Sequence, residues 1–197
     1  KDCAHHGQPK KSCHAIISKQ DGKTIREISL SYKELEDIRY TGMHEKYGEI
    51  TAVPAHYLTI PARKDWYLAS ISSDTIYRHL PNGDKHPYMV RTPSIHSMDP
   101  EVFLFPKMMT EQYDFLVSIK KKMTEHFSFP SENLIYDKQE KAVYTYTIQN
   151  TDFEGSDVAI WESSLNPEVA SYRILYAHDL VEAYEEGKLK GRLKEIA

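Results

Sequence analysis

Residues 110–127 read TEQYDFLVSIKKKMTEHF, the longest amphipathic stretch in a chain of 197 residues. Its apolar side chains recur at spacings of three and four: Tyr113, Leu116, Val117, Met123 and Phe127. This spacing predicts one apolar stripe along an α-helix, with the aliphatic stem of Lys120 lying on it. Thr110 is the expected N-cap, Glu111 and Asp114 suit the positive start of a helix, and the basic residues 120–122 suit its negative end. We therefore expect a long helix over residues 110–127.

The segments on both sides of this stretch have the patterns of short strands. Asp21-Gly22 separates two apolar runs and Pro81-Asn82-Gly83-Asp84 is a second turn sequence, so each predicts a hairpin. Asp179 and Glu182 form the capping pattern of a second helix. The expected strands cover residues 14–19, 24–30, 50–60, 66–71, 75–80, 86–91, 133–136, 142–148, 158–161 and 172–176.

These patterns predict an α+β fold class. We expect an antiparallel, meander-like sheet of short strands, covered by the helix at about 110–127 and by a C-terminal helix at about 179–187 or longer. A short helix is expected at residues 31–39, followed by a loop that contains Gly42 and Gly48. Residues 92–107 are rich in proline. Asp99-Pro100 is the expected start of a short helix that Pro106 ends, and we expect the apolar run of this segment to fill an edge of the core. Residues 1–13 form a polar arm containing Cys and His, and residues 14–197 are expected to form a single domain.

The composition of the chain limits the classes of partner that the protein is expected to bind. The chain has 25 basic and 29 acidic residues and a net charge of −4, which provides no general attraction to nucleic acid. No apolar run approaches the roughly 20 residues of a transmembrane helix. Oligomeric state stays open at this stage. No glycine-rich nucleotide loop and no nucleophile motif of a hydrolase is present, so no reaction is assigned from the sequence.

The only two cysteines, Cys3 and Cys13, lie in the polar arm. They could form a disulfide, remain free thiols, or bind a metal together with the three arm histidines His5, His6 and His14. A disulfide would indicate an oxidising compartment, so we expect an extracytoplasmic or secreted protein, with a cytoplasmic location as the alternative. Their spacing is not Cys-x-x-Cys, which weakens a redox function. Cys3 follows Asp2 rather than a small residue, which argues against a lipid anchor.

The chain has ten histidines, and three of them lie close together in the sequence near acidic residues. His79 and His86 flank the turn that contains Asp84, and His96 follows. These four residues are the candidate ligands of a metal site, which would make the chain a metal-binding protein or a metal-dependent hydrolase. No standard ligand spacing is present. No cofactor is expected unless these residues bind zinc or another transition metal.

The chain has 14 tyrosines among its aromatic residues, a bias that suits half-buried sheet positions and binding surfaces. Our first hypothesis is a non-enzymatic binding or accessory domain with a protein or a carbohydrate as its partner. Its candidate binding residues are Trp66, Tyr67, Tyr88 and Trp161, because aromatic rings bury much area at low entropic cost. The metal-dependent function is the alternative.

Overall fold

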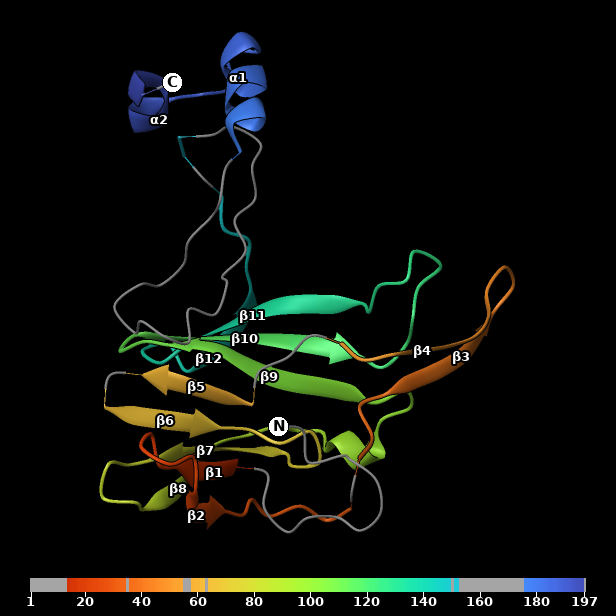
Figure 1. The fold of residues 1–197 in the computed structure, drawn as a ribbon, viewed down its shortest axis with the longest axis vertical. Coiled ribbons are helices and arrows are strands. Elements are labelled where there is room, and N and C mark those ends of the chain that lie inside the picture. The colour runs from red at the N-terminus through yellow and green to blue at the C-terminus, as the bar shows by residue number, and fades with distance from the viewer. Residues whose placement is uncertain are drawn as a thin grey trace.

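The structure is a computed structural model that describes residues 14–34, 36–54, 58–62, 64–149, 151–152 and 176–196. In these ranges the chain forms antiparallel strands that pair into two hairpins and two four-stranded sheets (Figure 1). The predicted antiparallel sheet is thus confirmed. The strands are β1 (His14–Ile17), β2 (Thr24–Ile28), β3 (Tyr40–His44), β4 (Gly48–Ala52), β5 (Thr59–Ala62), β6 (Asp65–Leu68), β7 (Thr75–His79), β8 (Lys85–Val90), β9 (Val102–Met109), β10 (Tyr113–Lys120), β11 (Ser131–Asp137) and β12 (Ala142–Thr145).

The predicted α+β fold class is wrong, because the stretch expected to be the main helix is a strand. β10 lies inside the sheet ordered β12-β11-β10-β9 and pairs along both edges. Its register runs from Asp114 opposite Met109 to Lys120 opposite Val102 on β9, and from Tyr113 opposite Asp137 to Ile119 opposite Ser131 on β11. The backbone N–H and C=O groups of β10 can therefore form hydrogen bonds with the two neighbouring strands, in place of the bonds that they would form within a helix.

The helical periodicity arose because β10 is buried on both of its faces. Asp114 and Leu116 share one face, whereas Val117 and Ile119 share the other, and all four are buried. A strand with two covered faces lacks the alternation of apolar and polar residues that identifies a half-exposed strand. The content of Tyr, Phe, Val and Ile in this segment favours a strand, and it outweighs the spacing of three and four.

Other expected elements also differ from the structure. The described residues of 31–39 form no helix, and no helix starts at Asp99; the only helical turn between β8 and β9 is the 3-10 turn η1 (Ile95–Ser97). The expected loop around Gly42 and Gly48 is the β3–β4 hairpin. The hairpins at Asp21-Gly22 and at residues 81–84 are confirmed. The expected strands at 158–161 and 172–176 lie mostly outside the described residues.

Two short helices, α1 (Ala177–Glu185) and α2 (Gly191–Ile196), lie near the C-terminus. A helix therefore forms where the C-terminal one was expected, but Figure 1 shows both helices standing apart from the sheets, so neither covers a sheet. Gly187 follows the C-cap of α1, and its φ of 71° is easily reached by glycine. No helix in the described part of the chain has the length and apolar character to cross a membrane.

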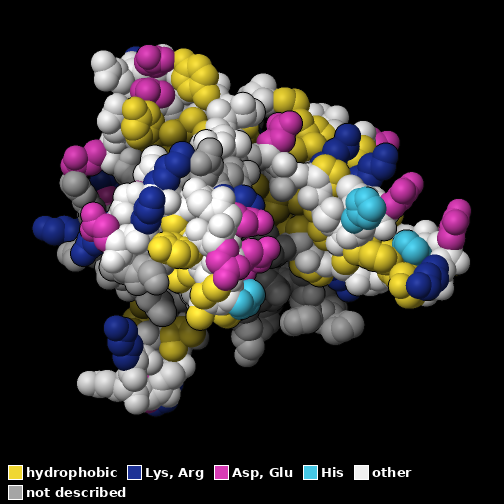
Figure 2. Space-filling model, turned by 90° about the horizontal axis from the view of Figure 1, so that it is seen from above, with side chains coloured by type: hydrophobic (Ala, Val, Ile, Leu, Met, Phe, Trp, Pro, Cys, Tyr) yellow, Lys and Arg dark blue, Asp and Glu magenta, His cyan; other side chains and the backbone are white. Residues whose placement is uncertain are grey.

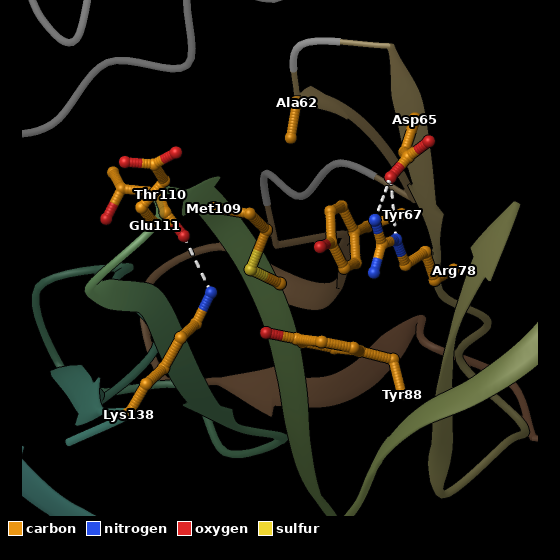
Figure 3. Close-up of a pocket in the computed structure, with 9 residues that line it drawn as sticks. All are labelled: Ala62, Asp65, Tyr67, Arg78, Tyr88, Met109, Thr110, Glu111 and Lys138. Atoms are coloured by element: carbon orange, nitrogen blue, oxygen red, sulfur yellow. Dashed lines mark hydrogen bonds and ion pairs between the residues drawn. The ribbon is translucent and has the colours of Figure 1, made fainter. Parts of the chain in front are cut away.

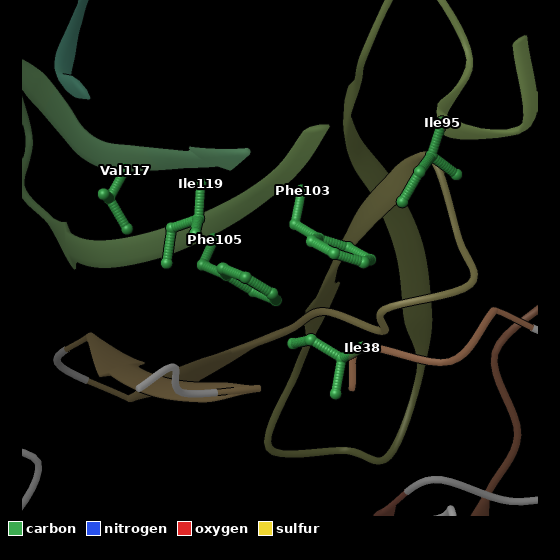
Figure 4. Close-up of a cluster of buried hydrophobic side chains, with 6 residues drawn as sticks. All are labelled: Ile38, Ile95, Phe103, Phe105, Val117 and Ile119. Carbon is green, nitrogen blue, oxygen red and sulfur yellow. The ribbon is translucent and has the colours of Figure 1, made fainter. Parts of the chain in front are cut away.

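The largest apolar side chains of the core come from β9 and β10 and pack against loop residues (Figure 4). Phe103 and Phe105 on β9 have ring centroids 6.0 Å apart and lie opposite Ile119 and Val117 in the register. Ile95 of the 3-10 turn and Ile38 pack on this group and belong to the same buried cluster. This cluster holds the chain around residue 38 and the turn η1 against the β9–β12 sheet.

The second sheet, ordered β5-β6-β7-β8, buries residues on both faces. Tyr67 and Ile76 belong to a cluster that includes Leu116 of β10, so this face points toward the β9–β12 sheet. Leu68 and Tyr77, the next residues along β6 and β7, instead pack with Leu30 beside the β1–β2 hairpin. Neighbouring residues on one strand thus serve two different interfaces. Each face of this sheet contributes to a separate pocket.

Candidate functional site

One pocket of about 310 Å³ opens between the β5–β8 sheet and the β9–β12 sheet (Figure 3), and we call it the tyrosine pocket. Its volume is at the small end of the range of about 300 to 1,000 Å³ for ligand pockets. Tyr67 and Tyr88 lie at its centre with Met109, and polar side chains surround them. The lining residues are Ala62, Asp65, Tyr67, Arg78, Tyr88, Met109, Thr110, Glu111 and Lys138.

A β-bulge in β8 positions Tyr88. Ile76 of β7 lies opposite Met89, whereas the next residue, Tyr77, lies opposite Pro87, so Tyr88 has no partner in the register. Bulges redirect a side chain and occur often beside functional sites. The Tyr88 ring meets the Tyr67 ring edge-on, with centroids 4.7 Å apart and an interplanar angle of 71°. This is the favoured geometry for two aromatic rings.

Asp114 on β10 anchors this pair of rings from below, and its side chain is 0 % exposed. The Tyr88 hydroxyl donates a hydrogen bond of 2.6 Å to Asp114 Oδ2. Lys138 Nζ forms an ion pair with Asp114 Oδ1 at 2.8 Å and donates to the backbone carbonyl of Thr110 at 2.6 Å. A buried carboxylate is tolerated only when it is paired and hydrogen-bonded, and both conditions hold here.

The two tyrosines are fixed in their protonated form. Burial, followed by the hydrogen bond to Asp114 and its negative charge, raises the pKa of Tyr88 far above the ordinary value for tyrosine. Burial likewise raises the pKa of Tyr67. A phenol with a raised pKa is a poor nucleophile and a poor general base near neutral pH. Both hydroxyls therefore serve as hydrogen-bonding groups on a rigid platform.

Charged residues form the rim of the pocket. Arg78 Nε donates to Asp65 Oδ2 at 2.6 Å, and Arg78 Nη2 lies 2.5 Å from the same oxygen. The hydrogen bond that Arg78 donates to Asp65 raises the pKa of Arg78, so the guanidinium stays charged. Arg78 lies directly opposite Tyr67 in the β6–β7 register, which places both side chains on one face of the sheet. The rim also includes Glu111, and it therefore offers donors and acceptors close to two aromatic rings.

The structure places the described members of the predicted binding set on opposite faces of the β5–β8 sheet. Tyr67 and Tyr88 come together in the tyrosine pocket. Trp66, 46 % exposed, precedes Tyr67 on β6 and therefore faces the opposite side of the sheet, where it lines a second pocket. Trp161 lies outside the described residues, as do Cys3, His5, His6 and Cys13. The predicted disulfide stays a prediction.

The structure does not bring the predicted metal ligands together at one site. His79 is 8 % exposed, whereas Asp84 and His86 are at the surface, where Asp84 Oδ2 accepts a hydrogen bond of 2.7 Å from Asn82 Nδ2. His96 lies between Glu36 Oε1, at 2.8 Å from Nδ1, and the Ser72 carbonyl, at 3.3 Å from Nε2. Among the described residues, no group of three or more His, Cys, Asp or Glu side chains is placed to hold a metal ion.

His14 and His79 predict a dependence of stability on pH. Burial lowers the pKa of both imidazoles below 6.5 in the folded protein. As the pH falls below 6.5, the unfolded chain binds protons that the folded chain does not, so the free energy of unfolding should decrease. Each histidine contributes a slope of at most about 1.4 kcal/mol per pH unit.

Urea unfolding at pH 7.5 and at pH 5.5 measures this effect, with those pH values chosen about one unit above and below the ordinary pKa. His79→Gln should reduce the loss of stability on acidification. His86→Gln, at an exposed position of the adjacent strand, controls for removing an imidazole from the same hairpin. A loss on acidification that His79→Gln leaves unchanged would contradict the assignment to His79.

The aromatic residues of the β3–β4 arm were missed by sequence reasoning. His44 stacks on Phe127 with ring centroids 4.6 Å apart, and Tyr47 meets Phe127 at 5.4 Å. Tyr47 and Phe127 are exposed. Figure 2 shows hydrophobic and charged side chains mixed along the arm that projects to the right. The signal in the sequence was Gly42 and Gly48, which were assigned to a loop although Gly42 lies inside β3 and Gly48 begins β4.

Comparisons with protein-family models, with curated proteins and with solved structures find no match for this chain. Fold and site together define its class on physical grounds alone. The described residues form an antiparallel β-sheet domain with a rigid, polar and aromatic pocket between two sheets. The function proposed below is therefore argued from the side chains of the site and not from the fold.

Proposed function

We propose that this chain is a non-enzymatic binding domain that recognises a carbohydrate in the tyrosine pocket. The observation that carries the proposal is the pair of rings of Tyr67 and Tyr88, held by the fully buried Asp114 and surrounded by charged groups. A sugar ring presents apolar C–H faces as well as hydroxyls. The partly exposed ring of Tyr88 suits the C–H groups, with the buried ring of Tyr67 supporting it from behind, and the rim suits the hydroxyls.

The rim chemistry supports a neutral, hydroxyl-rich ligand. Arg78 and Lys138 provide positive charges, and Asp65 and Glu111 provide negative ones, so no single sign dominates. Each hydroxyl is both a donor and an acceptor and can bond to groups of either sign. The volume of about 310 Å³ suits one ring-sized unit of a ligand better than a long chain.

Preorganisation supports binding over catalysis at this site. The Asp114 carboxylate is engaged by Tyr88 and Lys138, and Asp65 is engaged by Arg78. A general acid or base must contact the substrate, whereas these carboxylates are occupied by direct contacts with cations or donors of the protein itself. Rigid rings with their polar atoms already placed reduce the entropy that is lost when a ligand binds.

Titration calorimetry with a panel of monosaccharides and oligosaccharides tests the proposal. Arg78→Gln and Glu111→Gln should each weaken binding of the responding sugar about tenfold, the equivalent of one lost hydrogen bond to a charged group. Trp66→Phe, on the opposite face of the same sheet, is the matched control and should bind like the parent. Absence of any response at millimolar sugar, or rim variants that bind normally, would refute the assignment.

The proposed extracytoplasmic location rests on the predicted pairing of Cys3 and Cys13. Intact mass with and without a reductant, after alkylation of free thiols, tests that pairing. Alkylation of both cysteines without prior reduction would remove the support for export.

A further inference from the structure

A second and larger pocket of about 710 Å³ lies on the other face of the β5–β8 sheet, and we call it the histidine pocket. The β1–β2 hairpin forms one wall and the strands β5 to β7 form the other. Its volume lies well inside the range of about 300 to 1,000 Å³ for ligand sites. The lining residues are His14, Ala15, Ile16, Ile17, Ile28, Thr59, Lys64, Trp66, Leu68, His79, Leu80 and Pro81.

The register of the sheet brings the sheet-side wall together. Trp66 lies directly opposite His79 and Leu68 directly opposite Tyr77, so the side chains of these four residues share one face. Two contacts hold the hairpin against this face. His14 Nε2 donates to the Leu58 carbonyl at 2.9 Å, and Lys85 Nζ donates to the Ser29 carbonyl at 2.5 Å. The pocket is therefore a built feature between two anchored elements.

Two buried polar atoms, one on each wall of the pocket, lack partners within the described part of the chain: His14 Nδ1 in the hairpin and His79 Nε2 in the sheet. Buried polar atoms are almost always hydrogen-bonded, so each exception needs an explanation. The apolar side chains around them, such as Ile28 and Leu68, cannot provide a partner. Both atoms are covered by these side chains, so a ligand can bond to them only after the side chains move aside.

The charged side chain among the described lining residues of the pocket is positive. Among its described lining residues, Lys64 is charged and no Asp or Glu is present. Arg26 and Lys85 lie close enough to His79 for their positive charges to act on its imidazole. The tyrosine pocket, in contrast, includes Asp65 and Glu111. A positive potential in an apolar cavity favours an anionic group attached to an apolar body.

We infer that the histidine pocket binds an amphipathic organic anion, whose aromatic or aliphatic body lies between Trp66 and the hairpin and whose carboxylate or sulfonate lies near Lys64. This ligand class differs from the neutral sugar proposed for the tyrosine pocket. The two sites lie on opposite faces of one sheet and share no lining residue, so binding at one can be tested independently of the other.

The probe for this site is 1-anilinonaphthalene-8-sulfonate, an aromatic anion that fluoresces in apolar surroundings. The experiment uses the full chain with Trp161→Phe, which leaves Trp66 as its single tryptophan. We expect saturable binding with energy transfer from Trp66 to the dye. Lys64→Glu should weaken binding about tenfold or more by reversing the charge at the pocket wall.

Two controls make the outcome decisive. Lys122→Glu reverses the same charge at an exposed position after β10 and should bind the dye like the parent. N-phenyl-1-naphthylamine, an uncharged relative of the dye, should bind with an affinity that Lys64→Glu does not change. Cooperative urea unfolding of each variant shows that the dye reports a folded protein. Non-saturable binding, absence of energy transfer from Trp66, or equal effects of the two lysine variants would overturn the inference.

Discussion

Asp114→Asn is expected to destabilise the folded protein by about 3 kcal/mol, the lower end of the cost of about 3–5 kcal/mol for breaking a buried ion pair on one side. The amide keeps the shape of the carboxylate and can still accept from Tyr88. It cannot neutralise Lys138, whose ammonium lies 2.8 Å from Asp114 Oδ1. The lower end applies because the Lys138 side chain is 25 % exposed and can turn toward water.

Urea unfolding of a double-mutant cycle measures this interaction. The cycle compares Asp114→Asn, Lys138→Met and the double variant, and the coupling isolates the ion pair from losses of packing. Tyr88→Phe removes only the hydroxyl and should cost about 1.5–3 kcal/mol, the value for a hydrogen bond to a charged group. A destabilisation below about 1 kcal/mol for Asp114→Asn would contradict the anchoring role assigned to this network.

Phe103→Ala is expected to cost about 3–5 kcal/mol. Phe103 is 1 % exposed and stacks on Phe105, so truncation leaves a cavity in the cluster that also contains Ile38 and Ile95 (Figure 4). The chain around Ile38 has no strand or helix of its own and is held by this packing. It should therefore become less protected than the sheet itself.

Thermal and urea unfolding measure the loss, and hydrogen exchange locates it. Val143→Ala on β12 is the matched control, because Val143 is 58 % exposed in the same sheet and its truncation should change stability by less than about 0.5 kcal/mol. Equal effects of the two substitutions would show that Phe103 is not a core residue. The expected sign of both changes is destabilising.

Part of the tyrosine pocket could be anticipated from the sequence. Tyr67 and Tyr88 were selected as aromatic candidates, although nothing local indicated that they meet. Their meeting depends on the bulge that leaves Tyr88 unpaired in β8. Asp114 was interpreted as a favourable charge at a helix start, and Lys138 and Arg78 were not singled out. Their roles depend on contacts between strands that are distant along the chain.

The hairpins at Asp21-Gly22 and at residues 81–84 were determined by the sequence alone. Turn residues impose their backbone geometry within four positions, and the flanking strands then pair with their nearest neighbours. The composition of this chain likewise favours short strands over long ones, independently of how they assemble.

Only the tertiary structure decided the state of residues 110–127. The same apolar spacing fits one stripe of a helix and the two covered faces of an interior strand, so local pattern cannot separate them. Pairing with β9 and β11 on both edges selects the strand, and it directs Asp114 toward Tyr88 and Val117 toward Phe105. The residues that appeared to form one apolar stripe therefore build both the core and the floor of the candidate site, because neighbouring side chains of a strand point to opposite faces.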